Sequence, residues 1–117
     1  MNPSMAAADR DCTDEARYPN ISRAELAPLV QSKKAFVVDV NSKEKFKKSG
    51  IPGALHFGSN EKVFAEKLPK EKDALIVAYC GGPMCTAWKK AAERACNLGY
   101  SNIRHFKEGL QGWAAGS

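Results

Sequence analysis

The sequence lacks the features that mark several large classes of protein. None of its apolar runs approaches the roughly 20 residues that a helix needs to cross a bilayer, and residues 1–11 lack the charged-then-apolar layout of a signal peptide. We therefore expect a cytoplasmic protein that is not inserted in a membrane, or a periplasmic one if a leader has been removed. Lysine and arginine are spread along the chain, with no basic run interleaved with aromatic residues. This argues against nucleic-acid binding despite the net charge of +5.

The chain has four cysteines in 117 residues, and it lacks the Cys-x-x-Cys spacing of thiol oxidoreductases. Cys12 lies in residues 1–17, which contain almost no large apolar side chains, so we expect a disordered tail there. Cys96 falls on the apolar face of a predicted helix, and we expect it to be buried packing. Neither position suggests a structural disulfide framework. The absence of such a framework is typical of a protein from a reducing compartment. Cys85 and Cys96 would stand about 16 Å apart along one helix. No metal site is predicted, because this is too far to share an ion.

The chain is long enough for one domain with its own core. Its apolar fraction of 44% and charged fraction of 26% are typical of a soluble globular protein. Extended or strand-like segments at 18–21, 35–40, 54–57, 74–80 and 102–106 alternate with helix-like segments at 22–30, 42–46, 60–68 and 84–98. Several of the strand-like segments are apolar throughout, so the alternation predicts a parallel sheet covered by helices on both faces.

The most informative stretch joins an apolar strand to a helix through a glycine-rich loop. The run 74–79 ends on Cys80, and the loop 81–86 leads into the helix. Backbone N–H groups and the helix dipole favour an anion at this position. A thiolate is such an anion, so Cys80 is either a nucleophile of lowered pKa or a buried cysteine that only ends the strand. Attack on a sulfur donor also requires that the thiolate be accessible.

Several short segments before and after this loop are informative through their order and spacing. They are Val38-Asp39-Val40, Phe46, Ile51-Pro52-Gly53-Ala54, Val77-Ala78-Tyr79-Cys80, Leu98-Gly99-Tyr100, Ile103 and Gly109-Leu110-Gln111-Gly112-Trp113. Together they resemble a single rhodanese-like sulfurtransferase domain. The resemblance implies a three-layer α/β/α sandwich around a five-stranded parallel sheet, with one domain at residues 18–117. It also implies that Cys80 cycles between thiol and persulfide, without a metal or organic cofactor.

In this family the persulfide carries sulfane sulfur from a small anionic donor, such as thiosulfate or a polysulfide, to a nucleophilic acceptor. The donor and the persulfide would rest in a ring of backbone amides, which the resemblance assigns to Gly81, Gly82, Met84, Cys85 and Thr86. The acceptor is expected to be a thiol or a protein of unknown identity. The sequence carries no indication of an oligomeric state.

The loop departs from that pattern at Cys85, where typical active members have a basic residue. We therefore expect thiosulfate to be held less well than a guanidinium would hold it. Cys85 is either a resolving thiol that attacks a Cys80 persulfide or a small packed residue. A disulfide between the two is predicted if their Cα atoms lie within ~7 Å. The alternative function is a weakly active or non-catalytic rhodanese module that acts as a redox sensor or binds a partner. Thr86 stands where related phosphatases have an arginine, which argues against phosphatase activity.

The remaining polar residues near strand ends carry weaker signals. Asp39 is predicted to tie down neighbouring loop amides rather than to act as a base. His56 and His105 fall in predicted strands and are interpreted as structural or surface residues. Arg104 and Lys107, near the last strand, would help to attract an anion if they lie at the rim of the site.

Overall fold

The computed structural model describes residues 11–115. One sheet contains four parallel strands in the order β2-β1-β3-β4: β1 (Phe36–Asp39), β2 (Leu55–His56), β3 (Ile76–Tyr79) and β4 (Ile103–His105). The helices are η1 (Glu15–Arg17), α2 (Arg23–Gln31), α3 (Lys43–Ser49), α4 (Phe57–Asn60), η2 (Glu61–Val63), α5 (Phe64–Lys67), α6 (Trp88–Asn97) and α7 (Gly109–Ala115). No helix within residues 11–115 is long and apolar enough to cross a membrane.

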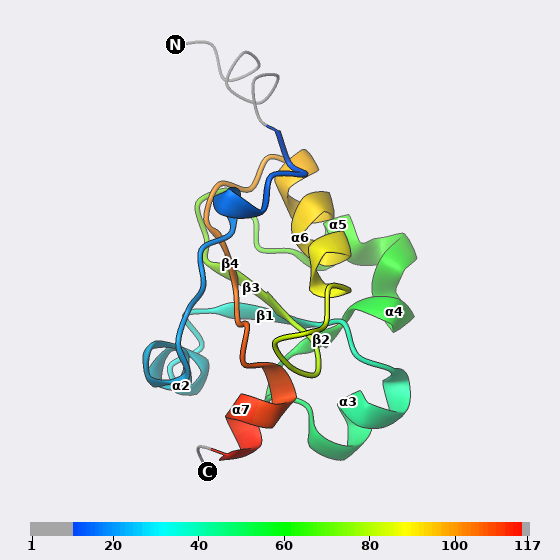
Figure 1. The fold of residues 1–117 in the computed structure, drawn as a ribbon. Coiled ribbons are helices and arrows are strands. Elements are labelled where there is room, and N and C mark those ends of the chain that lie inside the picture. The colour runs from blue at the N-terminus through cyan, green and yellow to red at the C-terminus, as the bar shows by residue number, and fades with distance from the viewer. Residues whose placement is uncertain (1–10, 116–117) are drawn as a thin grey trace.

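The sheet separates two hydrophobic cores, and Figure 1 shows helices on both of its sides. Along β3, Ile76 and Ala78 belong to the core that α4, α5 and α6 cover, whereas Val77 and Tyr79 belong to the core beneath α2 and α7. All four side chains are buried. A central parallel strand that is covered on both faces reads as a continuous apolar run, which is the pattern seen in the sequence. The predicted α/β/α sandwich with a parallel sheet is confirmed.

The sheet has four strands, whereas five were predicted. The segment 18–21 runs beside β4 but makes only an isolated parallel bridge, between Asn20 and His105. The Ile21 N–H donates to the His105 carbonyl, and the His105 N–H donates to the Pro19 carbonyl, both at 3.0 Å. Proline has no N–H of its own to extend the ladder. The expected edge strand is therefore reduced to a single bridge.

The predicted disordered tail is wrong for residues 11–17, and residues 1–10 lie outside the described residues. Cys12 is 7% exposed and forms a disulfide with Cys96 of α6, their Cα atoms 5.7 Å apart. The Tyr18 hydroxyl donates to the Cys12 carbonyl, and Asp14 caps η1 by accepting the Ala16 N–H at 3.0 Å. A cross-link thus orders a segment that has little apolar surface of its own. Cys12 and Cys96 are a structural pair, so their positions no longer argue for a reducing compartment.

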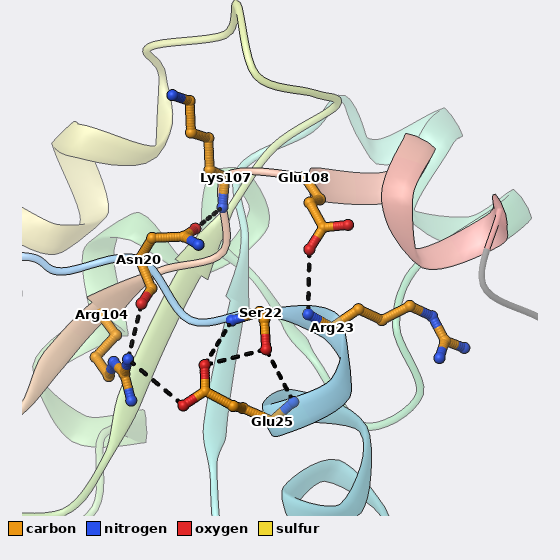
Figure 2. Close-up of polar contacts among 7 residues, drawn as sticks. All are labelled: Asn20, Ser22, Arg23, Glu25, Arg104, Lys107 and Glu108. Carbon is orange, nitrogen blue, oxygen red and sulfur yellow. Dashed lines mark hydrogen bonds and ion pairs between the residues drawn. The ribbon is translucent and has the colours of Figure 1, made fainter.

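The helix α2 begins where the sequence predicts. Ser22 accepts the Glu25 N–H through its hydroxyl, and Glu25 accepts the Ser22 N–H through its carboxylate, both at 3.1 Å. This reciprocal pair is a capping box, and it satisfies two N–H groups that the first turn leaves free. Figure 2 shows the pair beside the ends of β4 and α7, where Glu108 accepts the Arg23 N–H at 3.1 Å.

Two later helices differ from their predicted bounds. The helix predicted at 84–98 begins only at Trp88, because the Cys85 N–H donates to the Gly82 carbonyl in a turn, at 3.2 Å. The helix predicted at 60–68 begins at Phe57 and is divided into α4, η2 and α5. Its cap is the His56 ring, which accepts the Ser59 N–H at 3.2 Å.

Candidate functional site at the end of the central strand

Cys80 lies at the carboxyl end of β3, between the ends of β1 and β4. The Val40 N–H donates to the Tyr79 carbonyl at 2.9 Å, which carries the pairing of β1 and β3 up to the cysteine. Cys80 is 2% exposed and packs in the core beneath α6. The structure therefore places the residue where the sequence predicts, but its side chain is covered rather than open to solvent.

The loop after Cys80 leaves most of the predicted amide donors unpaired. Within residues 11–115, four of its N–H groups donate to no protein acceptor: those of Gly81, Gly82, Met84 and Thr86. The Cys85 N–H is used by the turn to Gly82. Unpaired N–H groups between a strand end and a helix N-terminus can bind an anion. Four of the five predicted amides thus remain available to one.

α7 closes the other side of the loop. Its first residue, Gly109, has φ +62°, and an added Cβ would lie 2.5 Å from the Cys80 carbonyl oxygen. Only glycine allows this close approach. The next two N–H groups of α7 donate to the loop, from Leu110 to Cys80 and from Gln111 to Gly81, both at 3.0 Å. The first turn of α7 therefore holds the backbone of Cys80 and Gly81. Sequence reasoning missed this role, although Gly109 was part of the motif it used.

Asp39 is fully buried and fixes the neighbouring strand end. Its Oδ1 accepts the backbone and side-chain amides of Asn41, at 2.7 and 2.8 Å. Its Oδ2 accepts the Tyr79 hydroxyl, and that hydroxyl accepts the Ile51 N–H at 3.0 Å. Burial first, and then the hydrogen bond to Asp39, raises the pKa of Tyr79 above its ordinary value. The predicted structural role of Asp39 is confirmed.

His56 extends this network and is also structural. The Ser59 N–H donates to its Nδ1 at 3.2 Å, and its Nε2 lies 2.8 Å from the Asn41 carbonyl. Because Nδ1 accepts, the neutral ring carries its proton on Nε2 and donates it to Asn41. His56 is 6% exposed, so it braces the loop after β1 rather than facing a substrate.

Cys85 is joined to Cys80 by a disulfide. Their Cα atoms are 6.3 Å apart, within the limit that the sequence analysis set. The two partners differ in exposure, because Cys80 is buried whereas Cys85 is only half-buried. Within residues 11–115, no cluster of three or more His, Cys, Asp or Glu side chains could hold a metal ion.

A cavity of about 330 Å³ opens beside Cys85. Its walls come from the N-terminal segment, the loop after β3, the start of α6 and the end of β4; they include Tyr18, Pro83, Cys85, Trp88, His105 and Lys107. We call it the Cys85 cavity. The sequence did not predict this cavity: Glu15 in its wall belongs to a segment that was expected to be disordered, and Tyr18 is far in sequence from the wall residues of the loop after β3 and of α6.

Aromatic rings form one wall of the Cys85 cavity. The Trp88 and His105 rings are stacked, with centroids 3.6 Å apart and planes 12° apart, and Tyr18 meets Trp88 edge-on at 5.9 Å. Burial, and to a lesser degree the Lys107 charge, lowers the pKa of His105 to about 4. His105 is therefore neutral at neutral pH.

The two basic residues near the last strand have different partners. Arg104 donates to the Asn20 carbonyl at 2.7 Å and lies 4.0 Å from the Glu25 carboxylate. Lys107 lines the Cys85 cavity, and its backbone N–H donates to the Asn20 side chain at 3.0 Å. Figure 2 shows the Lys107 side chain pointing away from Glu25 and Glu108. Of the two, Lys107 is the one that lines the cavity beside the loop.

Known proteins resemble this chain in sequence and in fold. A model of the rhodanese-like domain matches residues 22–116. The protein YibN of Escherichia coli (strain K12) is 30% identical over 98 residues, which cover 80% of this chain and 66%, just under two thirds, of YibN. The thiosulfate:glutathione sulfurtransferase of Homo sapiens is 28% identical over 111 residues, covering 84% of this chain and 95% of that protein. The structure of the human single-domain sulfurtransferase TSTD1 superimposes with a TM-score of 0.64 at 22% identity, covering 85% of this chain and 97% of that one. This chain belongs to the rhodanese-like domain family.

Proposed function

We propose that the chain is a sulfurtransferase that carries sulfane sulfur as a persulfide on Cys80. The donor is thiosulfate or a polysulfide, and the acceptor is a thiol. The observation that carries the proposal is a cysteine at the carboxyl end of the central strand, followed by a loop with four unpaired N–H groups. Membership of the rhodanese-like family and similarity to a human sulfurtransferase support it.

The reaction begins from the reduced pair. The Cys80 thiolate attacks the outer sulfur of thiosulfate, a Cys80 persulfide forms and sulfite leaves with the electron pair of the broken S–S bond. An acceptor thiolate then attacks the outer sulfur of the persulfide and returns Cys80 to the thiolate. Each species on Cys80 is an anion, which the unpaired loop amides can stabilise. The loop has no basic side chain, so we expect weak binding of thiosulfate.

A second candidate function follows from the disulfide. The Cys85 thiolate can attack the inner sulfur of a Cys80 persulfide, which forms the Cys80–Cys85 disulfide and expels hydrosulfide. The same pair can also form by direct oxidation of two thiols. A module that reports oxidant or sulfide levels through this pair, with little turnover, is the alternative. The presence of the disulfide in the structure favours it.

One experiment tests the sulfurtransferase. The protein is reduced, freed of reductant and incubated with thiosulfate or polysulfide, and its intact mass is measured. We expect a gain of one sulfur atom that Cys80→Ser abolishes. Cys85→Ser is the matched control, because it removes a thiol from the same loop but should keep the gain and lengthen its lifetime. Sulfur transfer by Cys80→Ser at the native rate would show that the assignment is wrong.

The two candidates differ in turnover. Steady-state transfer from several donors to a thiol favours the enzyme. Negligible turnover, combined with a Cys80–Cys85 midpoint potential near the poise of the cell, favours the redox module.

A further inference from the structure

We propose that the Cys85 cavity binds a small anionic thiol, which attacks the Cys85 sulfur and reopens the Cys80–Cys85 disulfide. The inference rests on the proposed function, because it identifies how the Cys80 thiolate is returned to use. It assigns a binding site, a ligand class and the sulfur that is attacked.

Cys85 is more accessible to a thiol than Cys80 is. Cys80 is 2% exposed, and the first turn of α7 covers its backbone. Cys85 is half-buried and lines the cavity. Thiol–disulfide exchange needs a thiolate to reach one sulfur, and the other sulfur then leaves. Attack at Cys85 makes Cys80 the leaving thiolate, beside the unpaired loop amides that favour an anion.

The cavity also has a positive charge in its wall, that of Lys107. Lys107 lines the cavity and is held beside the loop by its neighbours in sequence. The Phe106 N–H donates to the Ala78 carbonyl, and the Leu110 N–H donates to the Cys80 carbonyl, both at 3.0 Å. Among the described residues the Lys107 side chain has no ion pair, so its charge is available to a ligand.

One carboxylate also lines the cavity, that of Glu15 in η1. η1 (blue in Figure 1) lies near α6. Lys107 stands two residues beyond β4, between residues whose N–H groups donate to the end of β3, whereas no backbone hydrogen bond in the described part of the chain joins Glu15 to the loop. An anionic group next to the thiol fits this arrangement.

The volume and the apolar wall of the Cys85 cavity suit a small molecule. A volume of about 330 Å³ is near the lower end of small-molecule pockets, which favours a small thiol over a protein. The stacked rings of Trp88 and His105 supply an apolar wall for the carbon skeleton. Because the pKa of His105 is lowered, this wall adds no positive charge at neutral pH.

Reduction of the Cys80–Cys85 disulfide consumes two thiol molecules. The first thiolate bonds to the Cys85 sulfur, the Cys80–Cys85 bond breaks and Cys80 leaves as a thiolate. A second thiolate attacks the small-molecule sulfur of the mixed disulfide and frees Cys85 as a thiolate. The two thiols supply two electrons and end as their own symmetrical disulfide.

A charge series tests the site. Reduction of the Cys80–Cys85 pair is followed with 2-mercaptoethanesulfonate, 2-mercaptoethanol and cysteamine, which share a two-carbon skeleton but are anionic, neutral and cationic. Each reaction is quenched with an alkylating reagent, and the alkylated peptide Asp73–Lys89, which holds both cysteines, is quantified. Rates are expressed per thiolate. We expect the anionic thiol to react fastest and the cationic thiol slowest, and salt to reduce the difference.

Two lysine variants isolate the charge. Lys107→Gln should lower the anion-to-cation rate ratio about threefold, the size expected for one exposed charge. Lys70→Gln is the matched control, because Lys70 is exposed and precedes β3, at the opposite end of the sheet. Glu15→Gln should raise the ratio. Equal rates for the three thiols in the native protein, or equal effects of Lys107→Gln and Lys70→Gln, would overturn the proposal.

The attacked sulfur is identified separately. Rapid quenching after addition of 2-mercaptoethanesulfonate should trap a mixed disulfide, and fragmentation of the peptide Asp73–Lys89 should locate it on Cys85. An adduct on Cys80 would overturn the proposal. These assays contain no sulfur donor, so a protein that shows the charge preference but takes up no sulfur loses only the proposed function. A protein that takes up sulfur but shows no charge preference loses only this inference.

Discussion

The two disulfides of this protein are the same bond in different settings. Cys12 and Cys96 are 84 residues apart in sequence, whereas Cys80 and Cys85 are five apart. Both partners of the first pair are buried. In the second pair, Cys85 is half-buried and borders a cavity. The first bond holds a segment of chain in place, and the second joins the proposed nucleophile to a residue that a small molecule in the cavity could reach.

The chain-entropy model quantifies this difference. Closing a loop of the length between Cys12 and Cys96 is expected to stabilise the folded state by about 4–5 kcal/mol, and closing the loop between Cys80 and Cys85 by about 2 kcal/mol. The long loop restrains the unfolded chain much more than the short one does. We therefore assign stability to the first pair and chemistry to the second.

The largest expected effect comes from removing the long-range pair. The double variant Cys12→Ala/Cys96→Ala should lower the free energy of unfolding by about 4–5 kcal/mol, measured by urea denaturation without reductant. Its matched control is Cys80→Ala/Cys85→Ala, which should lose about 2 kcal/mol or less. After reduction, the first variant should still add one sulfur to Cys80, and the second should not. Equal losses of stability would contradict the division of roles.

A glycine pair tests whether α7 protects the reactive disulfide. Gly109→Ala places a Cβ 2.5 Å from the Cys80 carbonyl oxygen, so α7 or the loop must move. Gly53→Ala has the same kind of backbone, with φ +81°, but no atom within 4 Å of the new Cβ. We expect about 1 kcal/mol of strain at Gly53 and about 2 kcal/mol or more at Gly109.

The kinetic outcome separates the two disulfides further. Reduction of Cys80–Cys85 by a neutral thiol should be faster in Gly109→Ala than in Gly53→Ala, whereas reduction of Cys12–Cys96 should be the same in both. Alkylation of each cysteine peptide over time measures the rates. Equal rates for Cys80–Cys85 in the two variants would show that α7 does not shield it.

The smallest expected effect is a pH dependence from His105, which lies between the two pairs. Its ring stacks on Trp88, and Trp88 meets Tyr18, whose hydroxyl is bonded to Cys12. Burial lowers the pKa of His105 from its ordinary value of 6.5 to about 4 in the fold. Because the unfolded chain binds the proton more readily in this window, the contribution of His105 to stability is complete above pH 6.5 and is lost as pH falls toward 4.

Solvent screening of this half-buried ring limits the loss to about 1 kcal/mol or less. The measurement compares urea denaturation of the native protein and of His105→Gln across that pH window. Carboxylates that titrate there affect both proteins equally, so the difference between the two curves reports His105. If the free energies of unfolding of the native protein and of His105→Gln changed in parallel with pH, the pKa assigned to His105 would be contradicted.

The sequence predicted the centre of the molecule well. β3 is recognisable because both its faces are buried, and a strand covered on both sides has to be apolar throughout. The position of Cys80 then follows from the end of that run. The capping box at Ser22 and Glu25 is a local signal, and the local structure agrees with it.

What the sequence did not predict depends on contacts between distant residues. The order of residues 11–17 depends on the bond from Cys12 to Cys96, and composition contains no trace of that pairing. The Cys85 cavity was not predicted because it also depends on a contact between distant residues, that of Tyr18 with Trp88. The division of the helix after β2 depends on the His56 side chain, which replaces the expected polar caps. Pro19 was visible in the sequence, but its effect on the fifth strand depends on its position opposite β4.

The contact between α7 and Cys80 has a practical consequence for handling this protein. Because the N–H groups of Leu110 and Gln111 donate to the carbonyls of Cys80 and Gly81, a displacement of α7 would move the backbone of Cys80. A fluorophore, affinity tag or fusion joined after α7 is therefore expected to disturb the Cys80–Cys85 pair.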